Sequence, residues 1–164
     1  MKLFLLRHAT AKETFPDEDR ELSDYGVAQV IKLAESVSNN LFENIAQVWH
    51  SPFTRARQTS DIFVQKTNLN CPVLTSNEII PTAYPEEVAR MIAGLSCFGA
   101  DLLIVAHNPL LESLTRTLLG KKQACVTFKT STMACLNMII PPSQENLFGE
   151  WTLEFLISPE IINK

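Results

Sequence analysis

The feature that most constrains the fold is the segment 101–106, Asp-Leu-Leu-Ile-Val-Ala, a short apolar run that ends at His107. Residues 3–6 form a second apolar run, which ends at Arg7 and His8. Neither run alternates apolar with polar residues, and continuous apolar stretches of this length are typical of strands buried on both faces. Such strands lie inside a sheet that carries helices on both sides, so the two runs favour an α/β fold.

Segments with helical periodicity alternate with the candidate strands. Ser23 is an N-cap type of residue, and apolar residues recur at helical spacing from Val27 to Val37. Further helices are expected to start at Ser51-Pro52, to span Glu86 to Leu95 after Pro85, and to run from Asn108-Pro109 to Gly120. One further strand is expected to end at Trp49. Three others are expected to span Cys71 to Leu74, Met133 to Ile140 and Trp151 to Ile157.

Strands that alternate with helices imply a largely parallel sheet covered on both faces, and the last two strands are expected to add an antiparallel edge. The chain has 164 residues, of which 46% are hydrophobic and 20% charged, the composition of an ordinary globular protein. No linker or repeat divides the chain. We therefore expect residues 1–164 to form a single domain.

Charge and hydropathy exclude several classes of protein. A net charge of −4 argues against a general nucleic-acid binder, which neutralises phosphates with clustered Lys and Arg. The apolar start of the chain is too short for a signal peptide, and no run reaches membrane-spanning length, so a cytoplasmic protein is expected. The thiols, which we expect to be reduced and buried, are Cys71, Cys97, Cys125 and Cys135.

Chemistry-bearing residues follow three of the predicted strands. Arg7 and His8 follow the first, His50 and then Arg55 follow the second, and His107 follows the fourth. Ligands of open parallel sheets bind beyond the carboxyl ends of the strands. The three junctions are therefore expected to converge on one pocket.

The residue types at these junctions indicate a site for a phosphate-like anion. Arg55 lies in the first turn of a predicted helix, whose free N–H groups favour an anion, and a guanidinium can bond two phosphoryl oxygens. His8 is the candidate nucleophile, because a neutral imidazole has a free lone pair without a separate base. Arg7, Arg55 and a protonated His107 would stabilise charge on the transferring group.

Other interpretations of these residues agree less well with the sequence. A zinc site of His8, His50 and His107 is conceivable, but no two of them have metal-ligand spacing and no carboxylate motif accompanies them. Only five scattered glycines are present, so no phosphate-binding glycine loop is expected. His50 is interpreted as structural. Residues 10–21 are predicted to be a loop whose acidic side chains are solvated.

Three ordered motifs resemble those of the histidine phosphatase superfamily, also called phosphoglycerate mutase-like. Leu6-Arg7-His8-Ala9 is similar to its first motif, Ser51 to Thr59 to its second, and Ala106-His107-Asn108-Pro109 to the motif of its second histidine. Short SixA-type phosphohistidine phosphatases share further features, here Arg20-Glu21-Leu22-Ser23 with Gly26 and Phe128-Lys129-Thr130-Ser131 with Ala134.

The resemblance implies a three-layer α/β/α sandwich in which His8 is phosphorylated and Arg7, Arg55 and His107 bind the phosphoryl group. It implies a phosphatase that needs no metal or cofactor, and Arg20 is a candidate for substrate contact. Many superfamily members use a carboxylic acid after the third strand, where Glu78 is the candidate, although its surroundings differ from the glycine-rich segment of the mutases.

The implied substrate is phosphohistidine in a protein, such as a histidine-containing phosphotransfer domain. Only one helix fits between the third and fourth predicted strands, so no inserted segment covers the pocket. Two alternatives stay open: a phosphomonoesterase of small phosphorylated metabolites, and a phosphoprotein-binding module without turnover.

Overall fold

The computed structural model describes residues 1–96 and 99–162. Its described strands are β1 (Lys2–Arg7), β2 (Ile45–His50), β3 (Val73–Thr75), β4 (Asp101–Ala106), β5 (Met133–Ile140) and β6 (Glu150–Ile157). Its described helices are α1 (Asp24–Ser36), α2 (Thr54–Thr67), α3 (Pro85–Leu95) and α4 (Leu110–Leu118), with short 3-10 helices η1 (Asp17–Asp19), η2 (Asn39–Phe42) and η3 (Asn77–Ile79).

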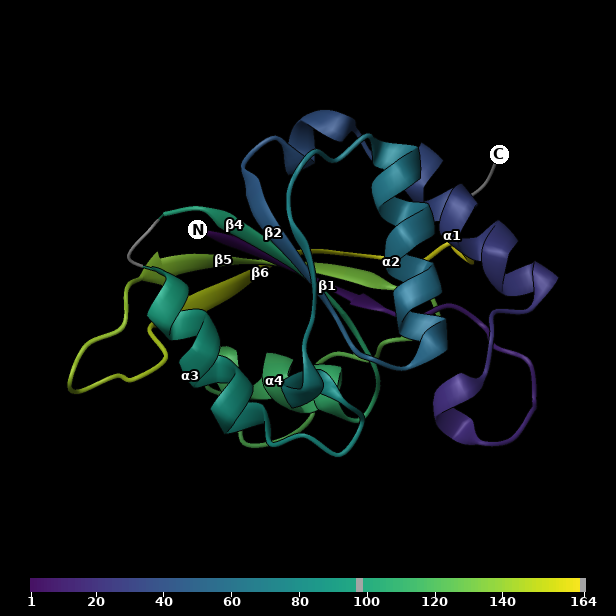
Figure 1. Ribbon diagram of the computed structural model, residues 1–164. Helices are drawn as coiled ribbons and strands as arrows, with labels where there is room; N and C mark the ends of the chain where they lie inside the picture. Colours follow the sequence, from purple (N-terminus) through teal and green to yellow (C-terminus); the bar gives the residue numbers. More distant parts are fainter. Residues whose placement is uncertain (97–98, 163–164) are drawn as a thin grey trace.

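These strands form one mixed sheet in the order β3-β2-β4-β1-β5-β6. The four strands β1 to β4 run parallel, β5 pairs antiparallel with β1, and β6 pairs antiparallel with β5. The predicted α/β class and the antiparallel edge are both confirmed. The sheet lies between α1 and α2 on one side and α3 and α4 on the other (Figure 1).

Alternate side chains of the central strands build two cores. In β1, Leu3 and Leu5 face the core beneath α3 and α4, whereas Phe4 and Leu6 face the core beneath α1 and α2. All six residues of β4 are buried, as expected for a strand between two helical layers. The apolar runs were therefore continuous because both faces of these strands are covered.

Two predicted helix starts were wrong by a residue or more. The helix expected from Ser51-Pro52 begins at Thr54, with Phe53 at the N-cap. Asn108 does not cap α4, whose N-cap is Pro109: the side-chain oxygen of Asn108 has no hydrogen-bond partner among the described residues, and its amide nitrogen donates to the carbonyl of Phe128 and to Glu112. The Phe128 carbonyl is 20 residues away, so a local sequence pattern does not reveal that contact.

The thiols differ in their surroundings. Cys135 is buried as expected and Cys71 is partly buried, but Cys125 is exposed, so the prediction was wrong there. Cys97 lies outside the described residues. None of the helices within residues 1–96 and 99–162 has the length and apolar character needed to cross a membrane.

Candidate active site

The carboxyl ends of β1, β4 and β2 place the predicted residues at one edge of the sheet. Arg7 pairs in register with Ala106, and His50 with Val105, so the residues that follow β1 and β4 are neighbours. The ring centroids of His8 and His107 are 4.9 Å apart. The expected convergence of these two junctions is therefore present.

His8 is held in one tautomer by its own backbone. Its Nδ1 lies 2.8 Å from the carbonyl oxygen of Ala9, so Nδ1 carries the proton and donates it to that oxygen. The other nitrogen, Nε2, then has the lone pair, which accepts a hydrogen bond from Arg55 Nε at 3.3 Å. Burial, with the charges of Arg55 and Arg7, lowers the pKa of His8 to about 4. The imidazole is neutral at pH 7.

Arg55 reaches the same point from the first turn of α2. Its side chain is 7% exposed, and it is held by Asp17, whose carbonyl oxygen accepts from Nη1 at 2.6 Å and whose Oδ2 accepts from Nη2 at 3.0 Å. The guanidinium carbon lies 4.9 Å from the centre of the Phe53 ring. The acidic loop was predicted to be solvated, and for Asp17 that was wrong, because a buried guanidinium needs a paired charge.

Arg7 lies beside this group at the end of β1. Its Nη1 donates to the carbonyl oxygen of Phe128 at 2.6 Å, while its Nε is buried and has no hydrogen-bond partner among the described residues. The Phe128 carbonyl also accepts from Asn108. One edge of Arg7 is thus anchored, and a donor stays available for an anion.

His107 is almost completely buried, and neither ring nitrogen has a hydrogen-bond partner in the described part of the chain. The Phe53 ring packs against it, with 5.1 Å between centroids. Burial, His8 and Arg55 lower the pKa of His107 to about 2, which favours a neutral ring. The protonated His107 expected during phosphoryl transfer stays a prediction. Buried polar atoms without hydrogen-bond partners favour the binding of a ligand that supplies such partners.

Polar contacts behind His8 hold its loop in place. The backbone N–H and hydroxyl of Thr10 both donate to the side chain of Gln29 in α1, and Gln29 donates to Thr130. A Cβ on Gly26 would lie 2.0 Å from the carbonyl oxygen of Thr10, so only glycine allows α1 to approach this closely. The loop is therefore clamped between α1 and the segment before β5.

The remaining predicted residues lie further out. Arg20 Nη1 donates to Asp17 Oδ1 at 3.1 Å, so Arg20 is linked to Arg55 only through Asp17. Glu78 is exposed in η3 and accepts a hydrogen bond from Ser76, with no described contact to His8 or Arg55. The three histidines do not assemble, and the described residues contain no group of metal-ligating side chains that would hold an ion.

Asp17 and Phe53 are the contacts that sequence reasoning missed. Phe53 lies within the second motif, Ser51 to Thr59, so the motif indicated that it is near the site. The motif did not predict that its ring packs against Arg55 and His107. Asp17 stands in an acidic stretch with no periodicity, and its partner is 38 residues away. Only the tertiary structure connects them.

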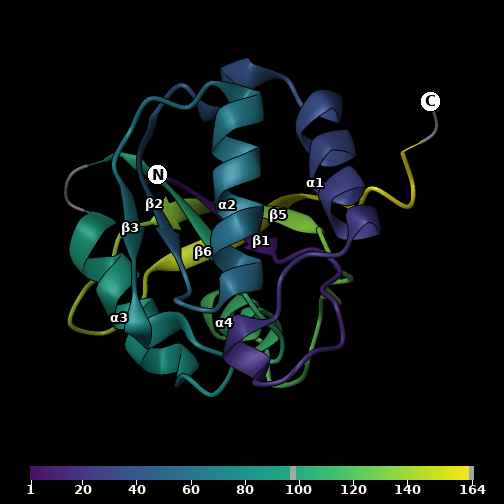
Figure 2. The same ribbon diagram turned by 45° about the vertical axis from the view of Figure 1, so that its right-hand side comes forward.

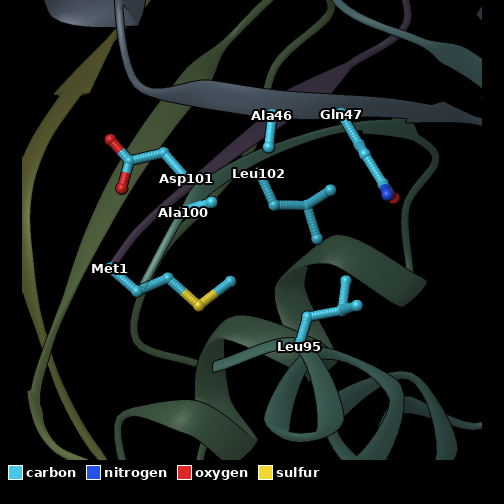
Figure 3. Close-up of a pocket in the computed structure, with 7 residues that line it drawn as sticks. All are labelled: Met1, Ala46, Gln47, Leu95, Ala100, Asp101 and Leu102. Atoms are coloured by element: carbon cyan, nitrogen blue, oxygen red, sulfur yellow. The ribbon is translucent and has the colours of Figure 1, made fainter. Parts of the chain in front are cut away.

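An apolar pocket of about 250 Å³ lies at the opposite edge of the sheet (Figure 3). Its lining residues are Met1, Ala46, Gln47, Leu95, Ala100, Asp101 and Leu102. Asp101 accepts a hydrogen bond from the backbone N–H of Lys2 at 2.6 Å. The described residues that line the pocket include neither Arg nor His, and none of them belongs to the histidine site, so this pocket is not the anion site.

Comparisons with known proteins agree with this geometry. The family model described as the histidine phosphatase superfamily (branch 1) matches residues 3–81, which contain Arg7, His8 and Arg55. No curated protein matches the chain in sequence.

Solved structures share the fold over nearly its whole length. The structure of the protein histidine phosphatase SixA complexed with tungstate is 25% identical, with 97% of each chain covered and a TM-score of 0.85. A protein from Agrobacterium tumefaciens that carries the SixA name is 23% identical, with 96% of this chain and 97% of that chain covered and a TM-score of 0.78. Mycobacterial glucosyl-3-phosphoglycerate phosphatase is 16% identical, with 93% of this chain and 96% of that chain covered and a TM-score of 0.71. In its motifs, its family match and its fold, the chain is similar to the histidine phosphatase superfamily, and it shares the three-layer build of the SixA proteins.

Proposed function

We propose that this protein is a phosphohistidine phosphatase that works through a covalent phospho-His8 intermediate. One observation carries the proposal: His8 Nδ1 is hydrogen-bonded to Ala9, which leaves the Nε2 lone pair beside Arg55 Nε and next to the ring of His107. A neutral imidazole with a fixed tautomer is a nucleophile that needs no additional base.

In the proposed first step, His8 Nε2 attacks phosphorus as the bond to the substrate's imidazole nitrogen breaks. A substrate ring that is protonated on its second nitrogen leaves as neutral imidazole and needs no acid. The Nδ1 proton of His8 stays in its hydrogen bond to Ala9, where the carbonyl stabilises the cationic phosphoimidazole. Water then attacks phosphorus, and the Nε2–phosphorus bond breaks to give inorganic phosphate and free His8.

Arg7, Arg55 and His107 are proposed to hold the three outer oxygens of the phosphoryl group during both steps. The buried Nε of Arg7 and the two nitrogens of His107 have no partners among the described residues, so an incoming anion gives them acceptors. A bound dianion also favours the charged ring. His107 is therefore proposed to take up a proton on substrate binding rather than to carry one beforehand.

The position of Glu78 favours phosphohistidine over a phosphoester. An alkoxide leaving group needs a proton from a nearby acid, whereas Glu78 is exposed and paired with Ser76. The similarity of fold to glucosyl-3-phosphoglycerate phosphatase supports a small-molecule phosphomonoesterase as the second candidate. A binding module without turnover is disfavoured because Arg7, His8, Arg55 and His107 are all present.

The proposed partner is a phosphorylated protein, such as a histidine-containing phosphotransfer domain, with a role in cytoplasmic signal transduction. The SixA structure, described as a protein histidine phosphatase, is the similarity that supports this choice. We also propose that neither a metal nor a cofactor takes part.

A substrate panel tests the proposal. Phosphohistidine-bearing protein, sugar phosphates and nucleotides are incubated with the wild-type protein and with His8→Ala, and released phosphate is measured, with and without a chelator. We expect turnover of phosphohistidine by the wild-type protein only, unaffected by the chelator. Strong turnover of a phosphoester with none of phosphohistidine would establish the second candidate instead.

A further inference from the structure

Asp17 has no role in the chemistry proposed above, yet it makes the closest polar contacts of Arg55. Its carbonyl oxygen is 2.6 Å from Arg55 Nη1, and its Oδ2 is 3.0 Å from Nη2. The contact is asymmetric, because the Arg55 side chain is 7% exposed and that of Asp17 is 52% exposed. The ion pair thus joins a partly exposed carboxylate to a buried guanidinium.

The two Asp17 contacts occupy one particular edge of the guanidinium. Nη1 and Nη2 together form its end edge, whereas Nε and the second hydrogen of Nη2 form its side edge. With the end edge held by Asp17, the side edge is turned toward His8, where Nε is 3.3 Å from Nε2. The side edge is also able to bond two oxygens of one phosphoryl group.

We propose that Asp17 is a positioning residue, which holds the end edge of Arg55 so that the side edge faces phosphorus at His8. Phe53 supports one face of the guanidinium, at 4.9 Å from the ring centre, so rotation of the plane is restricted on that side as well. This inference rests on the proposed function for its catalytic consequence, but not for its effect on anion binding.

Arg20 fixes Asp17 in turn. Its Nη1 contacts Asp17 Oδ1 at 3.1 Å, and its Nε donates to the carbonyl oxygen of Lys12 at 2.7 Å. Each carboxylate oxygen of Asp17 therefore serves one arginine. Figure 2 shows the purple loop that contains η1 beside the amino end of α2, where this chain of contacts begins.

Loss of the carboxylate leaves Nη2 of Arg55, whose side chain is 7% exposed, without that acceptor. The guanidinium is then able to turn its end edge toward the incoming anion, which moves the positive charge relative to His8. Small displacements of a positioning group cost up to about 100-fold in rate. We expect Asp17→Ala to lower kcat/KM by about 30-fold and Asp17→Asn, which keeps one acceptor, by about 5-fold.

Vanadate binding and phosphohistidine turnover are measured on Asp17→Ala, Asp17→Asn and the matched control Asp19→Asn. Asp19 lies in the same short helix, is exposed, and has no described side-chain hydrogen bond, so its substitution removes a charge without touching Arg55. We expect vanadate affinity and turnover to fall most in Asp17→Ala and less in Asp17→Asn. The control Asp19→Asn is expected to stay within about twofold of wild type.

A double-mutant cycle decides whether Asp17 acts through Arg55. In an Arg55→Ala background, Asp17→Ala is expected to change vanadate affinity by less than twofold, because the group that it orients is gone. An equal loss in both backgrounds, or an equal loss in Asp19→Asn, would overturn the positioning role. Vanadate needs no phosphohistidine, so weakened vanadate binding with no phosphohistidine turnover would support the positioning role and count against the proposed function alone.

Discussion

His8 and His50 both lie at the carboxyl ends of parallel strands, His50 as the last residue of β2 and His8 as the first residue after β1, and each makes the same kind of contact with the backbone. His8 Nδ1 is 2.8 Å from the carbonyl oxygen of Ala9, and His50 Nδ1 is 2.9 Å from that of Ser51. Their Nε2 atoms differ. That of His8 meets Arg55 Nε at 3.3 Å, whereas that of His50 lies 3.3 Å from the hydroxyl of Thr75.

The neighbouring strands explain this difference. β1 lies between β4 and β5, so the residue beyond its end is beside His107, and α2 brings Arg55 over it. β2 borders the short edge strand β3, where His50 pairs with Thr75, and the described partner of His50 Nε2 there is a hydroxyl and not a cation. A strand-end histidine is thus a nucleophile candidate here because of what its Nε2 faces, and its local conformation does not distinguish it.

Asparagine substitutions separate the two histidines, and the largest effect is expected for His8→Asn. The amide nitrogen of Asn replaces Nδ1 and keeps the hydrogen bond to Ala9, while the Nε2 nucleophile is lost. Turnover of phosphohistidine is expected to fall by at least about 10⁴-fold, with vanadate binding retained through Arg7 and Arg55. Steady-state kinetics and vanadate titration check this, and activity within tenfold of wild type would refute the role of His8.

Arg55→Ala and His107→Ala test the surroundings of Nε2. Each removes one group aimed at the transferring phosphoryl, and each is expected to lower kcat by about 10²- to 10³-fold. Single-turnover phosphate release measures the effect, with circular dichroism to confirm folding. A loss below tenfold for either variant would place that residue outside the site.

Acidification tests the low pKa values of His8 and His107. The unfolded chain binds protons on these rings below about pH 6.5, whereas the folded protein holds His8 neutral down to a pKa of about 4. The unfolding free energy is therefore expected to fall as the pH drops from 6.5 toward 4, by about 1.4 kcal/mol per pH unit for each ring.

Urea unfolding of wild type and His8→Asn between these pH values isolates that contribution. The variant lacks one of the two rings, so its unfolding free energy is expected to fall less steeply. Equal slopes would show that His8 titrates normally in the folded protein.

The smallest effect is expected for His50→Asn, the counterpart of His8→Asn. The amide keeps the hydrogen bond to Ser51, and only the contact with Thr75 is lost. Turnover is expected to stay within about threefold of wild type, and the unfolding free energy to fall by about 1 kcal/mol. A large loss of activity with an unchanged fold would show that His50, like His8, is needed for turnover, which would contradict this comparison.

Sequence patterns predicted the sheet more completely than the pocket. β4 was predicted at its observed bounds because both of its faces are buried, and α3 was predicted after Pro85 because a proline at the first position marks a helix start. The convergence of His8 and His107 followed from parallel strand ends. These features depend on periodicity or on the general geometry of parallel sheets.

The misses depend mostly on contacts between distant segments. Asn108 has the side chain of a cap, but Phe128 and Glu112 take its amide. Asp17 was assigned to solvent because nothing local connects it with Arg55. The charge of His107 depends on its burial beside Arg55 and His8, which no spacing reveals.

The central claim is that the phosphoryl group passes through Nε2 of His8, and trapping the phosphoenzyme tests it most directly. The protein is mixed with phosphohistidine substrate, quenched at alkaline pH where phosphoimidazoles persist, and digested for mass spectrometry, with His8→Asn as the control. We predict one phosphoryl group on the peptide that contains His8, formed and lost at the rate of turnover, and none in the control. Full turnover with no phosphorylated His8, or with the label on His50 or His107, would contradict the account.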